Sequence, residues 1–169
     1  HGKNWSEKAQ ANFPDNLKLR ELNHQHIFVL PFQVDNGFDL DSIQIGLKTL
    51  AEPYTRDKQL KKGIRDLGNI YLSPDDRHLL HGDFYPGSWI RTDEGIKVID
   101  PEFAFMGDVE FELGVLIAHL VLAGHDLEQL EDDIYSEYTI PYDPILANAY
   151  AGIEIMRRLI GIAQLPLSY

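Results

Sequence analysis

The sequence contains no cysteine, and this excludes two kinds of chemistry. A chain of 169 residues without a thiol forms no disulfide bond and has no thiolate for nucleophilic or redox catalysis. The composition is compatible with a reducing compartment. The absence of cysteine permits this compartment without requiring it, and we expect a cytoplasmic protein.

Long hydrophobic runs and basic residues are also scarce. No apolar stretch is long enough to cross a bilayer, and no basic segment leads into an apolar stretch at the start, as a secretory signal would. The chain has 15 Lys and Arg against 27 Asp and Glu, a formal net charge of −12. This charge repels nucleic acid phosphates and anionic lipids, so we expect neither nucleic acid nor a membrane as a partner. Most of the acidic excess is expected to serve solubility.

Apolar residues at helical spacing dominate the rest of the sequence, whose hydrophobic fraction of 44% suits a soluble domain. Capping residues and glycine or proline stops limit the helices. The predicted helices are 3–11, Asp39 or Asp41 to about Ala51, Asp57 to Tyr71, about Val109 to Leu120 with Gly124 as the stop, and a last one from about Asp143. The apolar run 26–32 is interpreted as a short strand or a buried turn limited by Pro31.

The middle of the chain has a different pattern. Residues 89–91 and 96–99 alternate in polarity and flank a turn that contains Asp93 and Gly95, which predicts a β-hairpin. A loop at 81–87 precedes the hairpin, and residues 100–102 follow it directly. The sequence thus predicts one domain over 1–169, mainly α with a small central β-hairpin.

Acidic residues lie at both ends of this hairpin. Asp83 precedes the first strand, and Asp100 and Glu102 follow the second. Because the two ends of a hairpin opposite its turn lie side by side, we expect the loop with Asp83 and the segment with Asp100 and Glu102 to converge. Three converging carboxylates repel one another unless a cation lies between them. Mg²⁺ is the natural candidate because it prefers oxygen ligands.

The order of these residues matches the needs of phosphoryl transfer. One carboxylate orients the acceptor hydroxyl and receives its proton, while groups one short loop later and after the next strand hold the metal. Protein kinases use His-Arg-Asp, four residues, Asn, then Asp-Phe-Gly. Here the order is His-Gly-Asp at 81–83, four residues, Ser88, then Asp-Pro-Glu at 100–102. We therefore predict Asp83 as the catalytic base and Ser88, Asp100 and Glu102 as metal ligands.

The stretch 79–114 resembles the aminoglycoside phosphotransferase and choline kinase superfamily. Its motifs His-Gly-Asp-Phe-Tyr-Pro-Gly-Ser at 81–88 and Asp-Pro-Glu-Phe-Ala-Phe at 100–105 look most like those of methylthioribose kinases. The resemblance implies the C-terminal lobe of a protein-kinase-like fold, with ATP as co-substrate and Mg²⁺ as cofactor. It also implies that Asp83, Arg157 and Arg158 approach the acceptor, and that Ser88 lies near the nucleotide and its metal.

The departures from this family leave the acceptor open. The motif interior Phe84-Tyr85-Pro86 differs from the Leu-His-Thr typical of methylthioribose kinases, and Phe111-Glu112 stands where the superfamily has Phe-Asp. A methylthioribose-like sugar, an aminoglycoside and an amino alcohol are the candidate acceptors. The sequence has no glycine-rich phosphate loop and no strand lysine. We accordingly expect that the N-terminal ATP-binding lobe is missing from these residues and that the fragment alone is inactive.

Each of these residues also has a structural interpretation. We expect His81 to fix the loop by hydrogen bonds instead of acting as a base, and Asp108, Glu110 and Glu112 to hold the loop or cap the following helix. Arg157 and Arg158 would otherwise be an exposed helix flank paired with acids, and at most one of them is expected to contact the acceptor.

Two other functions are compatible with the sequence. The first is a kinase-like module kept for binding without catalysis. The second is a metal-dependent hydrolase in which His81, Asp83 and Asp100 bind one ion directly.

Overall fold

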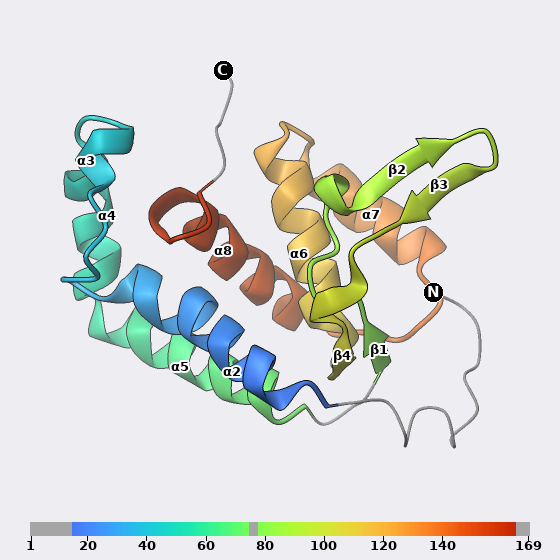
Figure 1. Ribbon diagram of the computed structural model, residues 1–169, viewed down its shortest axis with the longest axis horizontal. Coiled ribbons are helices and arrows are strands. Elements are labelled where there is room, and N and C mark those ends of the chain that lie inside the picture. The colour runs from blue at the N-terminus through green and yellow to red at the C-terminus, as the bar shows by residue number, and fades with distance from the viewer. Residues whose placement is uncertain (1–14, 75–77, 165–169) are drawn as a thin grey trace.

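Helices α6 (Val109–Leu122) and α8 (Pro144–Ile160) lie side by side at the centre of the molecule (Figure 1). The computed structural model describes residues 15–74 and 78–164. Helices α2 (Leu17–His24) and α5 (Lys58–Leu72) run along one side of this central pair. Helix α7 (Leu127–Glu137) packs on α6. Most of the fold is thus helical, as the sequence predicts.

The core fills the space between these helices. Tyr71 of α5 contacts Phe111 of α6 with ring centroids 4.8 Å apart, and Phe111 meets Tyr150 of α8 edge-on. Burial of such aromatic side chains is the main stabilising contribution in a core of this kind. Residues from seven elements share the cluster: Ile27, Phe28, Phe32, Ile64, Leu67, Tyr71, Leu80, Phe105, Val109, Phe111, Val115, Tyr150 and Ile153.

Two antiparallel strand pairs stand beside α6. The hairpin of β2 (Trp89–Thr92) and β3 (Gly95–Val98) confirms the prediction. The other pair, β1 (His78–Leu80) with β4 (Phe105–Gly107), was not predicted, because three-residue strands so far apart in sequence carry little pattern. The chain order is β1, loop, β2, β3, turn, β4. The loop between β1 and β2 and the turn between β3 and β4 therefore connect the same two strand pairs. This arrangement places the loop beside the turn.

Three of the predicted helices are confirmed with their end signals. Asp57 caps α5 by accepting hydrogen bonds from the backbone N–H groups of Gln59 and Leu60. Asp143 caps α8 in the same way. Gly124 follows the end of α6 with φ of +91°, a conformation that glycine adopts without strain.

Of the two interpretations of residues 26–32, the short strand was wrong, whereas the buried turn is close to what the structure has, because these residues form two buried helical turns. A π-helical turn, Gln25–Val29, and a 3₁₀ turn, Leu30–Phe32, extend α2 directly. The π-helical turn packs against α5 and α8 and buries Ile27 and Phe28 there. An apolar run of this length is equally compatible with a strand and with a buried helical segment, and it pairs with no strand among the described residues.

The single helix predicted from Asp39 or Asp41 to Ala51 is two helices, α3 (Leu40–Ile43) and α4 (Leu47–Arg56). Asp39 caps α3 as expected. The break comes at Gly46, whose φ of +88° ends the helical path, and the Asp41 carboxylate accepts the N–H of Gly46. Ile43 and Leu50, which helical spacing in a single helix would place on one face with Leu47, are exposed.

Two further predictions concern an N-terminal helix and membrane-spanning segments. The helix predicted at 3–11 lies outside the described residues. Among residues 15–74 and 78–164, every helix is too short or too polar to cross a membrane.

Gly114 of α6 is predicted to be essential for the contact between α6 and α8. A Cβ at this position would lie 2.5 Å from Tyr150 Cβ and 2.8 Å from the Ala147 carbonyl oxygen. We expect Gly114→Ala to lower the free energy of unfolding by about 1–3 kcal/mol, measured by urea denaturation, because overpacking displaces a helix.

The matched control is Gly152→Ala on α8, where a Cβ would meet no atom within 4 Å. This change should leave stability unaltered or raise it by up to about 1 kcal/mol through helix propensity. Equal destabilisation by both variants would contradict the proposed close contact.

Candidate functional site

The loop that carries Asp83 is held in place by Glu112, a buried residue in the first turn of α6. The Glu112 carboxylate accepts the backbone N–H of His81 at 2.8 Å and that of Gly82 at 3.0 Å. Burial raises the pKa of Glu112, and the two N–H groups oppose this effect. The expected structural role of Glu112 is thereby confirmed.

The same loop contacts the turn between β3 and β4. His81 Nε2 lies 2.7 Å from the carbonyl oxygen of Ile99, so the imidazole holds the loop, as predicted. Gly82 has φ of +83°, and a Cβ there would lie 2.3 Å from the Phe103 carbonyl oxygen. The predicted convergence of the two segments is therefore present at the level of the backbone.

Ser88 ties the end of the loop to its beginning. Its hydroxyl donates to the carbonyl oxygen of Asp83 at 2.9 Å, and its own carbonyl accepts the N–H of Ile99 at 2.9 Å. The side chain is buried. A hydroxyl oxygen keeps lone pairs when it donates, so this bond leaves Ser88 able to accept or to ligate.

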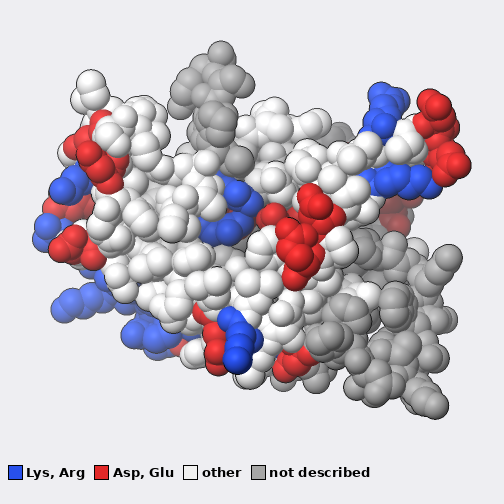
Figure 2. Space-filling model, in the orientation of Figure 1, with Lys and Arg blue, Asp and Glu red and all other residues white. Residues whose placement is uncertain are grey.

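Asp100 and Glu102 are exposed on the turn between β3 and β4, and Asp100 has left-handed backbone angles, with φ of 59°. Figure 2 shows acidic atoms at the surface over this segment, next to basic atoms over the C-terminal part of α8. In the part of the chain that the structure describes, no three His, Asp or Glu side chains are grouped as ready-made metal ligands. The two carboxylates nevertheless offer the oxygen atoms that Mg²⁺ prefers.

The Asp83 carboxylate faces the end of α8. Its Oδ1 lies 3.3 Å from Arg158 Nη2 and 4.0 Å from Arg157 Nη2. The side chain is 28% exposed. Burial raises the pKa of Asp83 above its ordinary value, and the guanidinium groups of Arg158 and Arg157 only partly offset this. A half-buried carboxylate with a raised pKa, still open to solvent, is suited to accept a proton.

The two arginines share an anchor that the sequence analysis missed, Glu154. Its carboxylate accepts Arg157 Nε at 2.7 Å and Arg158 Nε at 2.7 Å. His119 Nε2 of α6 lies 3.1 Å from Glu154 Oε1. Burial raises the pKa of Glu154, but the His119 hydrogen bond and the arginines lower it to about 2. The available signal was the spacing of Glu154, three and four residues before the arginines on one helix.

Tyr85 covers this network from the loop side. Its ring lies 5.3 Å from the guanidinium carbon of Arg158 and 4.6 Å, centroid to centroid, from His119. The arginines are thus largely buried, with side chains only 14% and 9% exposed, and they are not a solvated helix flank. The contact with Tyr85 holds Arg158 by a cation–π interaction.

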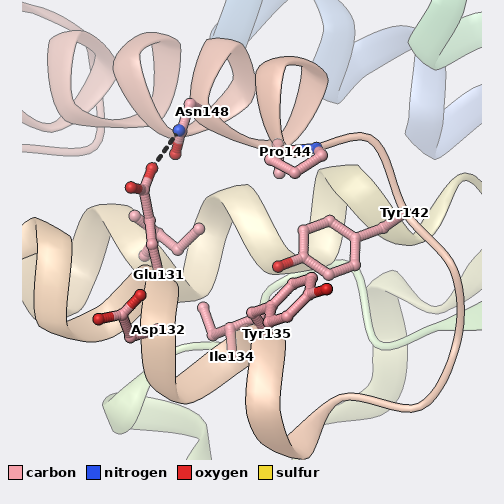
Figure 3. A pocket seen from close by; sticks show the side chains of 9 residues that line it. Glu131, Asp132, Ile134, Tyr135, Tyr142, Pro144 and Asn148 are labelled. Carbon is pink, nitrogen blue, oxygen red and sulfur yellow. Dashed lines mark hydrogen bonds between the residues drawn. The ribbon is translucent and has the colours of Figure 1, made fainter.

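A cavity of about 240 Å³ lies elsewhere, between α7 and α8 (Figure 3). It opens beside the first two turns of α8, whereas Asp83 faces the last two. None of the predicted site residues lines it, so it is not part of this site. Its walls are formed by Ile117, Glu131, Asp132, Ile134, Tyr135, Tyr142, Pro144, Ala147 and Asn148.

Comparison with known proteins gives a consistent assignment. Residues 39–158 match the phosphotransferase enzyme family, a stretch that includes every predicted site residue. The chain is 35% identical to a methylthioribose kinase of Exiguobacterium sibiricum, over 88% of this chain and 46% of that protein. It is 30% identical to a methylthioribose kinase of Bacillus velezensis, over 88% of this chain and 44% of that protein. It is 32% identical to methylthioribose kinase 1 of Oryza sativa, over 69% of this chain and 26% of that protein. The chain spans about half the length, or less, of these curated relatives.

Glu112 provides the test of how the loop is held. We expect Glu112→Gln to lower the free energy of unfolding by about 1–3 kcal/mol, because Oε2 would accept the N–H groups of His81 and Gly82 without a negative charge and the amide NH₂ would face the His81 N–H that now also reaches Oε1. Faster amide hydrogen exchange at these two residues should accompany the loss.

Glu110→Gln is the matched control on the same helix turn. Glu110 also accepts a backbone N–H, that of Asp143, but at an exposed position. Replacing Glu110 should lower the free energy of unfolding by much less and leave amide hydrogen exchange at His81 and Gly82 unchanged. A similar exchange pattern in both variants would show that Glu112 does not anchor the loop.

Proposed function

Because the chain belongs to the phosphotransferase enzyme family, we propose that it forms the catalytic part of a kinase that transfers the γ-phosphate of ATP to a hydroxyl group of a small molecule. The observation that carries the proposal is the setting of Asp83. Its half-buried carboxylate faces two arginines, on a loop that contacts the turn with Asp100 and Glu102. The reaction is placed in the cytoplasm because ATP is the co-substrate.

Asp83 positions the acceptor hydroxyl and takes its proton. The acceptor oxygen forms a bond to the γ-phosphorus, the bond from that phosphorus to the β–γ bridging oxygen breaks, and ADP leaves. The hydroxyl proton passes to the Asp83 carboxylate as the bond forms. Since Arg158 binds Oδ1, we assign Oδ2 to the acceptor hydroxyl.

Asp100 and Glu102, with the Ser88 hydroxyl, are the residues that would hold Mg²⁺. The ion, when bound, supplies positive charge that neutralises the phosphate oxygens. Ser88 has a second task, because its hydrogen bond to the Asp83 carbonyl fixes the loop backbone beside the base. Two exposed carboxylates on a turn that contacts this loop support the assignment.

The two arginines have different tasks in this proposal. Arg158 has contacts on all sides: Glu154 at Nε, the Ala163 carbonyl at Nη1, Asp83 at Nη2 and the Tyr85 ring over its plane. Among the described residues, Arg157 makes its hydrogen bonds through Nε and Nη2 to Glu154. We therefore assign Arg157 Nη1 to the acceptor and Arg158 to the alignment of Asp83.

The acceptor is proposed to be a methylthioribose-like sugar. This choice rests on the names of the relatives, which are methylthioribose kinases. Tyr85 and its neighbours depart from the motif of that family at the loop surface, so an aminoglycoside or an amino alcohol is the second candidate class. Residues 1–169 are proposed to act as one catalytic and acceptor-binding domain, with most contacts to ATP made by other residues.

The two alternatives receive less support. A hydrolase would need His81, Asp83 and Asp100 around one ion, but among the described residues no three such side chains are grouped closely enough to hold a metal. A binding module without catalysis would be expected to lack a base or a metal carboxylate. Asp83, Asp100 and Glu102 are all present.

Asp83→Asn should remove most of the activity. In the full-length protein, we expect kcat for ATP-dependent phosphorylation of methylthioribose to fall by about 10²–10⁴-fold, because the base is lost. The dissociation constant of Mg²⁺-ATP, measured by calorimetry, should change less than about twofold. Asp93→Asn in the exposed turn of the hairpin is the control and should behave as the wild type. Wild-type turnover by the Asp83 variant would contradict the proposal.

Asp100→Asn and Glu102→Gln test the metal assignment. Each should raise the Mg²⁺ concentration needed for half-maximal activity by about tenfold or more, since an oxygen ligand loses its charge. Glu94→Gln, at the exposed tip of the hairpin, should not change it. An unaltered Mg²⁺ dependence in both variants would place the ion elsewhere.

A further inference from the structure

We infer that Glu154 is a positioning residue of this site, which fixes the guanidinium groups of Arg157 and Arg158 against Asp83 and is itself held by His119. The inference rests on the proposed function, because it concerns how the same site recognises its acceptor. Glu154 contacts neither the acceptor nor ATP in this view. It acts through the arginines.

The contacts of Glu154 use both carboxylate oxygens. Oε2 accepts Arg157 Nε at 2.7 Å, and Oε1 accepts Arg157 Nη2 at 2.8 Å, a two-point contact of the kind arginine makes best. Oε1 also accepts Arg158 Nε at 2.7 Å. Glu154 is only 2% exposed, so these bonds are little weakened by water.

Helix geometry explains why such an anchor is needed. Neighbouring residues on an α-helix point about 100° apart, so Arg157 and Arg158 would not normally reach one point. Two guanidinium groups close together also repel each other. Glu154, at i−3 and i−4, lies on the helix face between both side chains and neutralises part of their charge. Both guanidinium groups can then approach Asp83.

His119 extends the anchor to the neighbouring helix. It is buried on α6, five residues after Gly114, and Glu154 follows Tyr150 by four residues on α8. The close contact of Gly114 with Tyr150 therefore continues one turn later as the contact of His119 with Glu154. Tyr85 stacks over His119 and closes the network from the catalytic loop.

The consequence is that Glu154 governs acceptor binding at a distance. If it loses its charge, the arginines have no fixed position, and Arg158 no longer holds the Asp83 carboxylate in one orientation. The Michaelis constant for the acceptor should rise and kcat should fall, whereas the ATP contacts should be unaffected. A residue with only a structural role would instead lower the fraction of folded enzyme without changing either Michaelis constant.

The test compares Glu154→Gln, Glu154→Asp and a control in the full-length protein. Glu154→Gln should lower kcat/KM for methylthioribose by about 10²-fold, with KM for the acceptor raised and KM for ATP within about twofold of the wild type. Glu154→Asp keeps the charge but is one methylene shorter, and should recover part of the loss. Glu131→Gln, which removes a carboxylate that binds Asn148 of α8 far from the site, should have no effect.

Variants at His119 keep the inference testable if Glu154→Gln folds poorly, and NMR adds a second readout if it folds. His119→Phe retains the stacking with Tyr85 but loses the hydrogen bond, and should raise KM for the acceptor, while His119→Gln should stay closer to the wild type. In NMR spectra, the Nε–H signals of Arg157 and Arg158 should be protected from exchange in the wild type and exposed in Glu154→Gln. This readout does not depend on activity.

The outcomes separate the two proposals. An inactive wild-type protein with protected arginine signals would overturn the proposed function and leave the anchor intact. An active wild type whose Glu154→Gln and His119→Phe variants keep an unchanged KM for the acceptor would overturn the role of Glu154. So would unchanged arginine signals in Glu154→Gln.

Discussion

The close packing of α6 against α8 at Gly114 sets the positions of the groups around Asp83. From one side of this contact, Glu112 of α6 reaches the backbone of the loop that carries Asp83. From the other side, His119 of α6 meets Glu154 of α8, next to the arginines that face the same aspartate. The backbone of the Asp83 loop and the arginines that face the Asp83 carboxylate thus both depend on the distance between α6 and α8. A small residue is required because a single methyl group would overlap Tyr150 and the backbone of Ala147.

The site contains two arginines, whereas the molecule as a whole is strongly acidic. The chain carries a net charge of −12, and residues 98–156 include no Lys or Arg at all. Arg157 and Arg158 are the first Lys or Arg residues after Lys97, and they bring positive charge to the carboxylates of Glu154 and Asp83. Their enclosure by Glu154, Asp83 and Tyr85 keeps that charge directed at one place. A low-dielectric setting makes such a localised charge more effective than the same charge in water.

Local patterns predicted the parts of the structure that local interactions determine. Apolar spacing and capping residues located α5, α6 and α8, and alternation located the hairpin that brings the Asp83 loop to Asp100 and Glu102. Features that depend on distant partners were missed. The pairing of β1 with β4 and the contact of His119 with Glu154 join residues that only tertiary packing brings together. The helical form of residues 25–32 is likewise decided by packing on α5 and α8.

The contact between Gly82 and the Phe103 carbonyl has a mechanical consequence. With no side chain between them, the loop of the base and the turn of the acidic pair touch backbone to backbone, and the His81 imidazole fastens the same two segments 2.7 Å from Ile99. Neither segment can slide without displacing the other. A rearrangement of the turn that carries Asp100 would be transmitted directly to Asp83, so the two halves of the site behave as one rigid piece.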